Sequence, residues 1–280
     1  MTLRKKRYEL MVFHGDGRRR LIGDDLGLES AADCFLCLPG LLETRESFTQ
    51  FAAAVAPHAR VLTLDWCGRG DSDRLSSAHD YRMSTYLSDL SLFYAHAVGI
   101  MTGASLVAHG RAPRIHLVGT SMGGLLAIFM ASHKPKHLGS LVLNDVGPLL
   151  PWSGVFSLMT EMSQAVKLNP IDLGGQELAQ QLNIDPALLH AVRQPGHLDL
   201  PHRSRLSGVD FTETFAQVSA PMLLVRGRSS EIVNDTVVKR LFEIHPVTRV
   251  FDCPDSAHPV PYNPAVCEEI LRFTNVKRAP

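Results

Sequence analysis

The chain alternates short β-rich runs with longer segments of helical spacing, and this alternation restricts the fold more than any other feature of the sequence. Runs typical of strands lie at 34–38, 61–64, 115–118, 141–143, 222–225 and 247–251. Apolar residues at three-to-four spacing predict helices between most of these runs. Strands that alternate with helices predict a mostly parallel sheet covered by helices on both faces, so the fold class is α/β.

Two segments depart from this alternation. Residues 8–22 predict a hairpin that turns at Gly15-Asp16-Gly17, because Asp-Gly is a strong turn signal. Residues 149–217 contain no convincing strand, and their apolar residues recur at helical spacing instead. We expect residues 149–217 to form an inserted helical cap, and residues 1–148 and 218–280 to form the core.

The segment Gly119-Thr120-Ser121-Met122-Gly123 has the form Gly-x-Ser-x-Gly and stands directly between a β-rich run and a helix. In that context the serine occupies a strained turn that presents its hydroxyl above the sheet edge. The flanking glycines let strand and helix approach closely. The backbone N–H of Met122 opens the helix, so it is available to a developing oxyanion. The motif therefore predicts a nucleophile at Ser121.

Beyond this motif the chain resembles the α/β-hydrolase family over almost its whole length. Leu38-Pro39-Gly40-Leu41 is similar to the family's oxyanion loop, residues 65–72 to the turn after its fourth strand, and residues 255–259 to its histidine loop. The resemblance implies a central sheet of about eight strands flanked by helices, and it makes the backbone N–H of Leu41 the second oxyanion donor. Many members carry His where this chain has Pro39, a change that leaves the main-chain donor in place.

His258 lies in the loop after the last predicted strand, which is where the family places its catalytic histidine. The chain order of the fold, serine before acid before histidine, is satisfied. A neutral imidazole takes the serine proton and returns it to the leaving group. We therefore predict His258 as the base.

The acid that orients His258 has two candidates. The family usually carries it after the seventh strand, where this chain reads Gly227-Arg228-Ser229-Ser230-Glu231. Many relatives have Asp at the position of Ser230, and Glu231 resembles a subgroup that reads R-G-x-x-S-D with Glu in place of Asp. Glu can hold the histidine tautomer and stabilise its cation. Asp145, after the sixth strand, is the alternative because some members carry the acid there; we place the acid at Glu231.

Composition excludes several other classes of function. Lys and Arg number 28, as do Asp and Glu, so no net charge steers the chain toward nucleic acid or an anionic membrane. No apolar run approaches the ~20 residues of a spanning helix, and we recognise no signal peptide. Five scattered cysteines do not make a disulfide framework, which indicates a cytoplasmic location.

Metal and redox sites are not expected either. His197, Asp199 and His202 have a spacing that fits no standard metal site. Cys34 and Cys37 have redox spacing, but they lie in a strand-like run, where residues three apart point to opposite faces. We expect neither metal nor cofactor.

These observations predict a serine hydrolase that cleaves a carboxylic ester, lactone or thioester through an acyl-enzyme. The partner is a small ester-like molecule, and the protein is a monomer or homodimer. Hydrolysis of a carbon–carbon bond in a ring-cleavage product is the alternative within the fold, favoured if basic residues such as Arg193 or Arg203 hold a substrate carboxylate. A non-catalytic binding protein is the alternative outside catalysis, since fold does not settle function.

Overall fold

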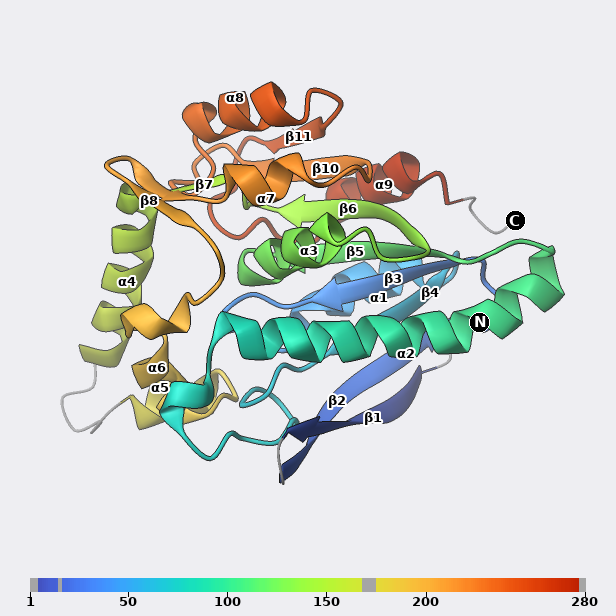
Figure 1. The fold of residues 1–280 in the computed structure, drawn as a ribbon, viewed down its shortest axis with the longest axis horizontal. Coiled ribbons are helices and arrows are strands. Elements are labelled where there is room, and N and C mark those ends of the chain that lie inside the picture. Colours follow the sequence, from blue (N-terminus) through green and yellow to red (C-terminus); the bar gives the residue numbers. More distant parts are fainter. Residues whose placement is uncertain (1–4, 15–16, 168–174, 277–280) are drawn as a thin grey trace.

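A sheet of eight strands runs through the computed structural model, which describes residues 5–14, 17–167 and 175–276 (Figure 1). The β1–β2 and β2–β4 pairs are antiparallel and the other neighbours are parallel. In spatial order the strands are β1 (Lys5–His14), β2 (Gly17–Gly27), β4 (Arg60–Leu64), β3 (Asp33–Leu38), β5 (Arg114–Thr120), β6 (Leu138–Asn144), β10 (Met222–Gly227) and β11 (Arg249–Cys253). The predicted fold class is confirmed.

Helices cover both faces of this sheet, and each face buries its own hydrophobic cluster. One face carries α1 (Thr49–Val55) and α9 (Pro264–Thr274), and the other carries α2 (Met83–His109), α3 (Met122–Ser132), α7 (Thr212–Ala216) and α8 (Asp235–Ile244). All six residues of β3 are buried, as expected for a strand covered on both faces. Cys34 and Cys37 belong to opposite clusters, which agrees with their predicted directions.

The first two strands form the predicted hairpin, with His14 opposite Gly17 and Lys5 opposite Leu26. The hairpin is longer than residues 8–22. Of the predicted turn, Gly15 and Asp16 lie outside the described residues.

Helix α2 is 27 residues long and packs one face on the core. Its buried residues include Tyr86, Leu90, Phe93, Ala97 and Met101, which recur at the spacing of a single helix face. By length and composition alone α2 is also long and apolar enough to cross a membrane, which we did not expect from the sequence. Its contacts with β1, β3 and α3 are those of a core helix.

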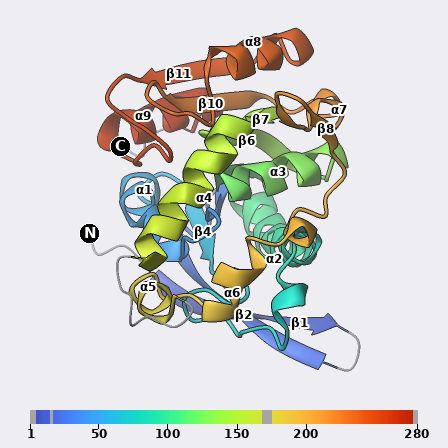
Figure 2. The same cartoon turned by 90° about the vertical axis from the view of Figure 1, so that its left-hand side faces the viewer.

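Within segment 149–217, the helices at 152–167, 176–181 and 186–191 lie beyond the sheet ends toward which β3 and β6 point, and Figure 2 views them from that side. The helices of the segment are α4 (Trp152–Lys167), α5 (Gln176–Gln181), α6 (Pro186–Ala191) and α7. The expectation of helices alone was wrong, because β7 (Leu149–Pro151), β8 (Arg203–Arg205) and β9 (Gly208–Asp210) form a small antiparallel sheet. Strands of three residues are too short to show a period-two pattern.

Backbone hydrogen bonds attach this segment to the turn after β4. The N–H of Gly70 donates to Asn183 O at 2.7 Å, and the N–H of Asp185 donates to Gly68 O at 2.7 Å. The Tyr81 hydroxyl adds a 2.6 Å hydrogen bond to the Asp185 carboxylate. The segment is therefore held on the core by both main-chain and side-chain bonds.

Candidate active site

Ser121 stands at the junction of β5 and α3 in a backbone conformation that is rare for a residue other than glycine. Its φ is 49° and its ψ is −114°, and such strain persists only where surrounding structure enforces it. Glycine makes the junction possible: a Cβ on Gly119 would lie 2.4 Å from Gly124 N, and one on Gly123 would lie 2.0 Å from Leu38 O. The predicted strained turn is therefore present.

Two hydrogen bonds join Ser121, His258 and Asp145 in series. His258 Nε2 lies 2.9 Å from Ser121 Oγ, and His258 Nδ1 lies 2.8 Å from Asp145 Oδ2. The structure does not bear out our preference for Glu231 as the partner of His258. Glu231 is exposed, and Asp145, the alternative, occupies the position next to the imidazole.

Strand order explains why the sequence left this choice open. Strands β6 and β10 are neighbours, so the loops after both open beside His258. Asp145 follows β6 directly, at a φ of 55°, and its side chain is fully buried. Its Oδ1 accepts the N–H of Gly227, and its Oδ2 accepts the hydroxyl of Ser230, at 3.1 and 2.5 Å. Gly227 and Ser230 thus donate hydrogen bonds to Asp145, and Asp145 itself bonds to His258.

Residues that the sequence analysis did not single out hold the histidine loop in place. Asn144 bonds to the backbone of Val260, and the hydroxyls of Tyr262 and Thr120 lie 2.9 Å apart. Thr120 directly precedes Ser121, so the loop that carries His258 is tied to the strand that carries the serine. In the sequence, the position of Asn144 next to Asp145 was the feature that could have indicated its role in holding this loop.

Three side chains hold the loop that follows β3. Trp66 Nε1 donates to Pro39 O at 3.0 Å, and Arg69 Nε donates to Leu41 O at 2.8 Å. Glu43 accepts the N–H of Gly40 at 2.7 Å. Burial raises the pKa of Glu43 above its ordinary value, although this hydrogen bond opposes the shift. The first turn of α3 approaches the same loop, because a Cβ on Gly123 would lie 2.0 Å from Leu38 O and 2.8 Å from Pro39 O.

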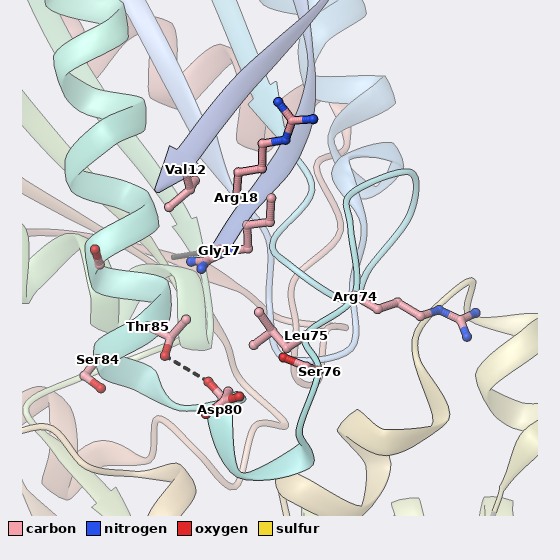
Figure 3. Close-up of a pocket in the computed structure, with 11 residues that line it drawn as sticks. Val12, Gly17, Arg18, Arg74, Leu75, Ser76, Asp80, Ser84 and Thr85 are labelled. Carbon is pink, nitrogen blue, oxygen red and sulfur yellow. Dashed lines mark hydrogen bonds between the residues drawn. The ribbon is translucent and has the colours of Figure 1, made fainter. Parts of the chain in front are cut away.

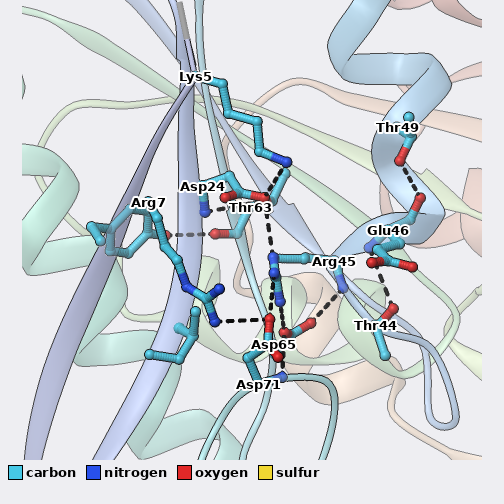
Figure 4. A network of polar contacts seen from close by, with 12 residues as sticks. Lys5, Arg7, Asp24, Thr44, Arg45, Glu46, Thr49, Thr63, Asp65 and Asp71 are labelled. Carbon is cyan, nitrogen blue, oxygen red and sulfur yellow. Dashed lines mark hydrogen bonds and ion pairs between the residues drawn. The ribbon is translucent and has the colours of Figure 1, made fainter. Parts of the chain in front are cut away.

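A network of charges fixes the far end of that loop to the turn after β4 (Figure 4). Arg45 bridges three carboxylates: Asp24 at 3.0 Å, Asp71 at 2.6 Å, and Asp65. Its backbone N–H donates to Asp65 as well, at 2.7 Å. The Arg45 hydrogen bond is the main reason that the pKa of Asp71 is lowered. Arg45 is not part of the Ser121–His258–Asp145 series, but it ties the loop near Ser121 to the sheet.

A cavity of about 150 Å³ lies beside His258, lined by Gly154, Ser157 and Leu158 from α4 and by Ser229 and Glu231 after β10. Another cavity, of about 320 Å³, lies between the ends of β1 and β2 and the first turns of α2 (Figure 3). The guanidinium groups of Arg18 and Arg74 point away from one another in Figure 3 and do not converge on a ligand position. The smaller cavity is the one that adjoins the Ser121–His258–Asp145 series.

The residues considered earlier for metal or carboxylate binding have other partners or positions. Asp199 accepts the backbone N–H of Ser84 at 2.9 Å, and His197 Nδ1 lies 2.8 Å from Tyr81 O. Arg203 is exposed and pairs with Glu213, and Arg193 is exposed. Within the described ranges, no three His, Cys, Asp or Glu side chains are grouped so as to hold a metal ion.

A sheet of this order, with a serine on a strained strand-to-helix turn hydrogen-bonded to a histidine, defines the α/β-hydrolase class. The family model described as the alpha/beta hydrolase fold matches residues 33–168. The solved structure of an alpha/beta hydrolase from Novosphingobium aromaticivorans superposes with a TM-score of 0.69 at 22% identity, covering 97% of this chain and 99% of that one. The chain therefore has the α/β-hydrolase fold.

The sequence relatives include hydrolases and also a putative 2-succinyl-6-hydroxy-2,4-cyclohexadiene-1-carboxylate synthase of Bacillus subtilis, which is 28% identical over 50% of this chain and 45% of that protein. The chain is 25% identical to the 3-hydroxybutyrate-oligomer hydrolase of Cupriavidus necator over 86% of this chain and 88% of that protein. It is 31% identical to the 2-hydroxy-6-oxo-6-phenylhexa-2,4-dienoate hydrolase of Comamonas testosteroni over 43% of this chain and 48% of that protein. The protein is therefore an enzyme of the hydrolase type.

Proposed function

We propose that the protein is a serine hydrolase that cleaves a carboxylic ester, lactone or thioester through an acyl-enzyme intermediate. The observation that carries this proposal is the series of two hydrogen bonds from Ser121 through His258 to Asp145. Each member has a separate task in this arrangement: nucleophile, base, and the acid that orients the base.

In the first half of the reaction, Ser121 Oγ bonds to the substrate carbonyl carbon while its proton passes to His258 Nε2. Asp145 stabilises the imidazolium that forms and holds the tautomer with a proton on Nδ1. The bond between the carbonyl carbon and the leaving oxygen or sulfur then breaks, and His258 protonates the leaving group. In the second half, His258 removes a proton from water, which bonds to the acyl carbon. The bond between that carbon and Ser121 Oγ then breaks, and His258 returns the proton to Oγ, which releases the acid and free Ser121.

The carbonyl oxygen becomes negatively charged in both halves, and we assign its stabilisation to the backbone N–H groups of Leu41 and Met122. Met122 is the first residue of α3, so its N–H precedes the first intrahelical hydrogen bond. Preorganised donors of this kind contribute most when the charge develops, because they need no reorganisation. Bonds from Trp66, Glu43 and Arg69 to the Leu41 loop support this role.

Residues 149–217 act as the cap in this proposal, and they set the shape of the substrate pocket. Residues of α4 and His258 line one cavity, which supports a pocket between cap and core. The attachments at Asn183 and Asp185 favour a cap that stays docked at this end during turnover.

Hydrolysis of a carbon–carbon bond is the second candidate, because one relative is a dienoate hydrolase. The same series of side chains serves both reactions. Among the basic residues weighed for holding a substrate carboxylate, Arg193 and Arg203 are both exposed, which does not favour this candidate.

The test is labelling of the intact protein with a fluorophosphonate, with Ser121→Ala as the control, read as the mass of the adduct. The expected result is one adduct on the wild type and none on the variant. The unlabelled wild type and Ser121→Ala are then assayed on a panel of ester, lactone, thioester and dienoate substrates. A folded wild type that takes no label and turns over none of the panel would overturn the proposal.

A further inference from the structure

The hydroxyl of Ser230 is bound on all sides inside the candidate active site. Ser230 is buried, and its Oγ lies 2.5 Å from Asp145 Oδ2, 3.1 Å from Ile232 N and 3.2 Å from Val233 N. A serine hydroxyl has one proton and two lone pairs. The two backbone N–H groups take the lone pairs, so the single proton of Ser230 points at Asp145.

This arrangement completes the set of donors around the buried carboxylate. Asp145 Oδ2 accepts both Ser230 Oγ and His258 Nδ1, and Oδ1 accepts the N–H of Gly227. Hydrogen bonds to both oxygens prevent the carboxylate from rotating. A buried acceptor without such donors would be destabilising, because burial has removed the water that would otherwise bond to it.

The contact between Ser230 and Asp145 also bears on the bond between Asp145 and His258. Its hydroxyl contacts the same carboxylate oxygen as His258, from the loop after the neighbouring strand β10. A carboxylate at position 230 would therefore reach toward the imidazole from the other strand.

We propose that Ser230 is a positioning residue for the reaction: its hydroxyl holds Asp145 Oδ2 against His258 and moderates the charge that Asp145 presents to the imidazole. The inference rests on the proposed serine hydrolase mechanism. Without the Ser230 proton, Asp145 carries more negative charge toward His258, so the imidazolium persists to higher pH. The other titratable groups that face the pair are Glu43, Glu231 and the Cys253 thiol, and the substitution leaves them unchanged.

The experiment measures kcat/KM for 4-nitrophenyl butyrate from pH 5 to 9 in the wild type, Ser230→Ala and Ser230→Thr. We expect Ser230→Ala to lower kcat/KM about tenfold or more, as for a lost hydrogen bond to a charged group, and to move the acid limb of the profile to higher pH. Ser230→Thr keeps the hydroxyl and should retain the wild-type limb. A folded Ser230→Ala with an unshifted acid limb would overturn the inference, even if its stability fell.

If Ser230→Ala does not fold, a second pair of variants tests the role of Ser230. Asp145→Asn is compared with the double variant Asp145→Asn/Ser230→Asp, which moves the carboxylate to the β10 loop. Recovery of at least tenfold in kcat/KM supports the inference, and a folded double variant with no recovery overturns it. If wild-type Ser121 takes no fluorophosphonate label, the serine mechanism itself fails; if the wild type is labelled and active, only the role of Ser230 is in question.

Discussion

Asn144 binds both backbone groups of Val260: its Nδ2 donates to Val260 O at 2.7 Å, and its Oδ1 accepts Val260 N–H at 3.1 Å. Asn144 is the last residue of β6 and is fully buried. Because Asp145 follows it and His258 lies two residues before Val260, one side chain ties the strand of the acid to the loop of the base. The Asp145–His258 distance therefore depends on this amide pairing.

Asn144→Ala should weaken both the fold and the site. Val260 would keep a buried N–H and C=O without partners, at about 1–3 kcal/mol for each group. We expect the free energy of unfolding in urea to fall by about 2–6 kcal/mol and kcat to fall with it. Asn234→Ala is the matched control, because that side chain caps α8 and its loss costs only about 1 kcal/mol. Equal activity in Asn144→Ala and Asn234→Ala would show that the bonds between Asn144 and Val260 are not needed to hold His258 in its active position.

The identity of the acid is decided by comparing Asp145→Asn with Glu231→Gln. Asn at 145 removes the carboxylate that selects the His258 tautomer, a change worth about 10⁴ in kcat for this kind of triad. Glu231 is exposed, and the two ring nitrogens of His258 bond to Asp145 and Ser121, so Glu231→Gln should keep activity within about threefold, as for an exposed charge. Steady-state kinetics on one ester checks both variants. The reverse ranking would restore Glu231 as the acid.

Gly123→Ala should damage the oxyanion loop. The added Cβ would lie 2.0 Å from Leu38 O and 2.8 Å from Pro39 O, and both are backbone atoms that move only with the loop. Displacing a donor from the oxyanion position costs about 10²–10³ in kcat. Gly103→Ala, where nothing lies within 4 Å of the added carbon, is the control and should remain fully active. Circular dichroism separates lost activity from lost fold.

Asp33 should make stability depend on pH in the acid range. Burial alone would raise its pKa, but hydrogen bonds from His116 and Arg114 outweigh burial and lower the pKa of Asp33 to about 2. The unfolded chain has a pKa of about 3.9 there, so it binds a proton that the folded chain does not. The stabilisation of about 2 kcal/mol is present above about pH 4 and is lost as pH falls toward 2.

Asp33→Asn removes this contribution. Urea unfolding of the wild type and the variant at pH 7, 4 and 2.5 should show a stability difference that shrinks as pH falls. A difference that stays constant over this range would mean that Asp33 acts through packing and not through its charge.

Local patterns were sufficient for most of the fold. Helices α8 and α9 begin directly after Asn234 and Asn263, whose side chains supply the N-caps, and apolar residues mark one face of each helix. The three-residue strands β7, β8 and β9 were missed because they are too short to show a period-two pattern, and because β7 pairs with β9 from a distant part of the chain. The sequence showed no apolar run of membrane-spanning length, because polar residues interrupt the run within α2 without breaking the helix.

The sequence by itself determined the α/β class, the strained turn at Ser121 and the histidine loop, because each rests on residues adjacent in the chain. Only the tertiary structure chose between Asp145 and Glu231. Both residues follow strands whose ends lie side by side, and sequence spacing does not say which side chain turns toward His258. That choice follows from the backbone at Asp145 and from hydrogen bonds that arrive from Gly227 and Ser230, contacts that exist only once β6 and β10 are paired.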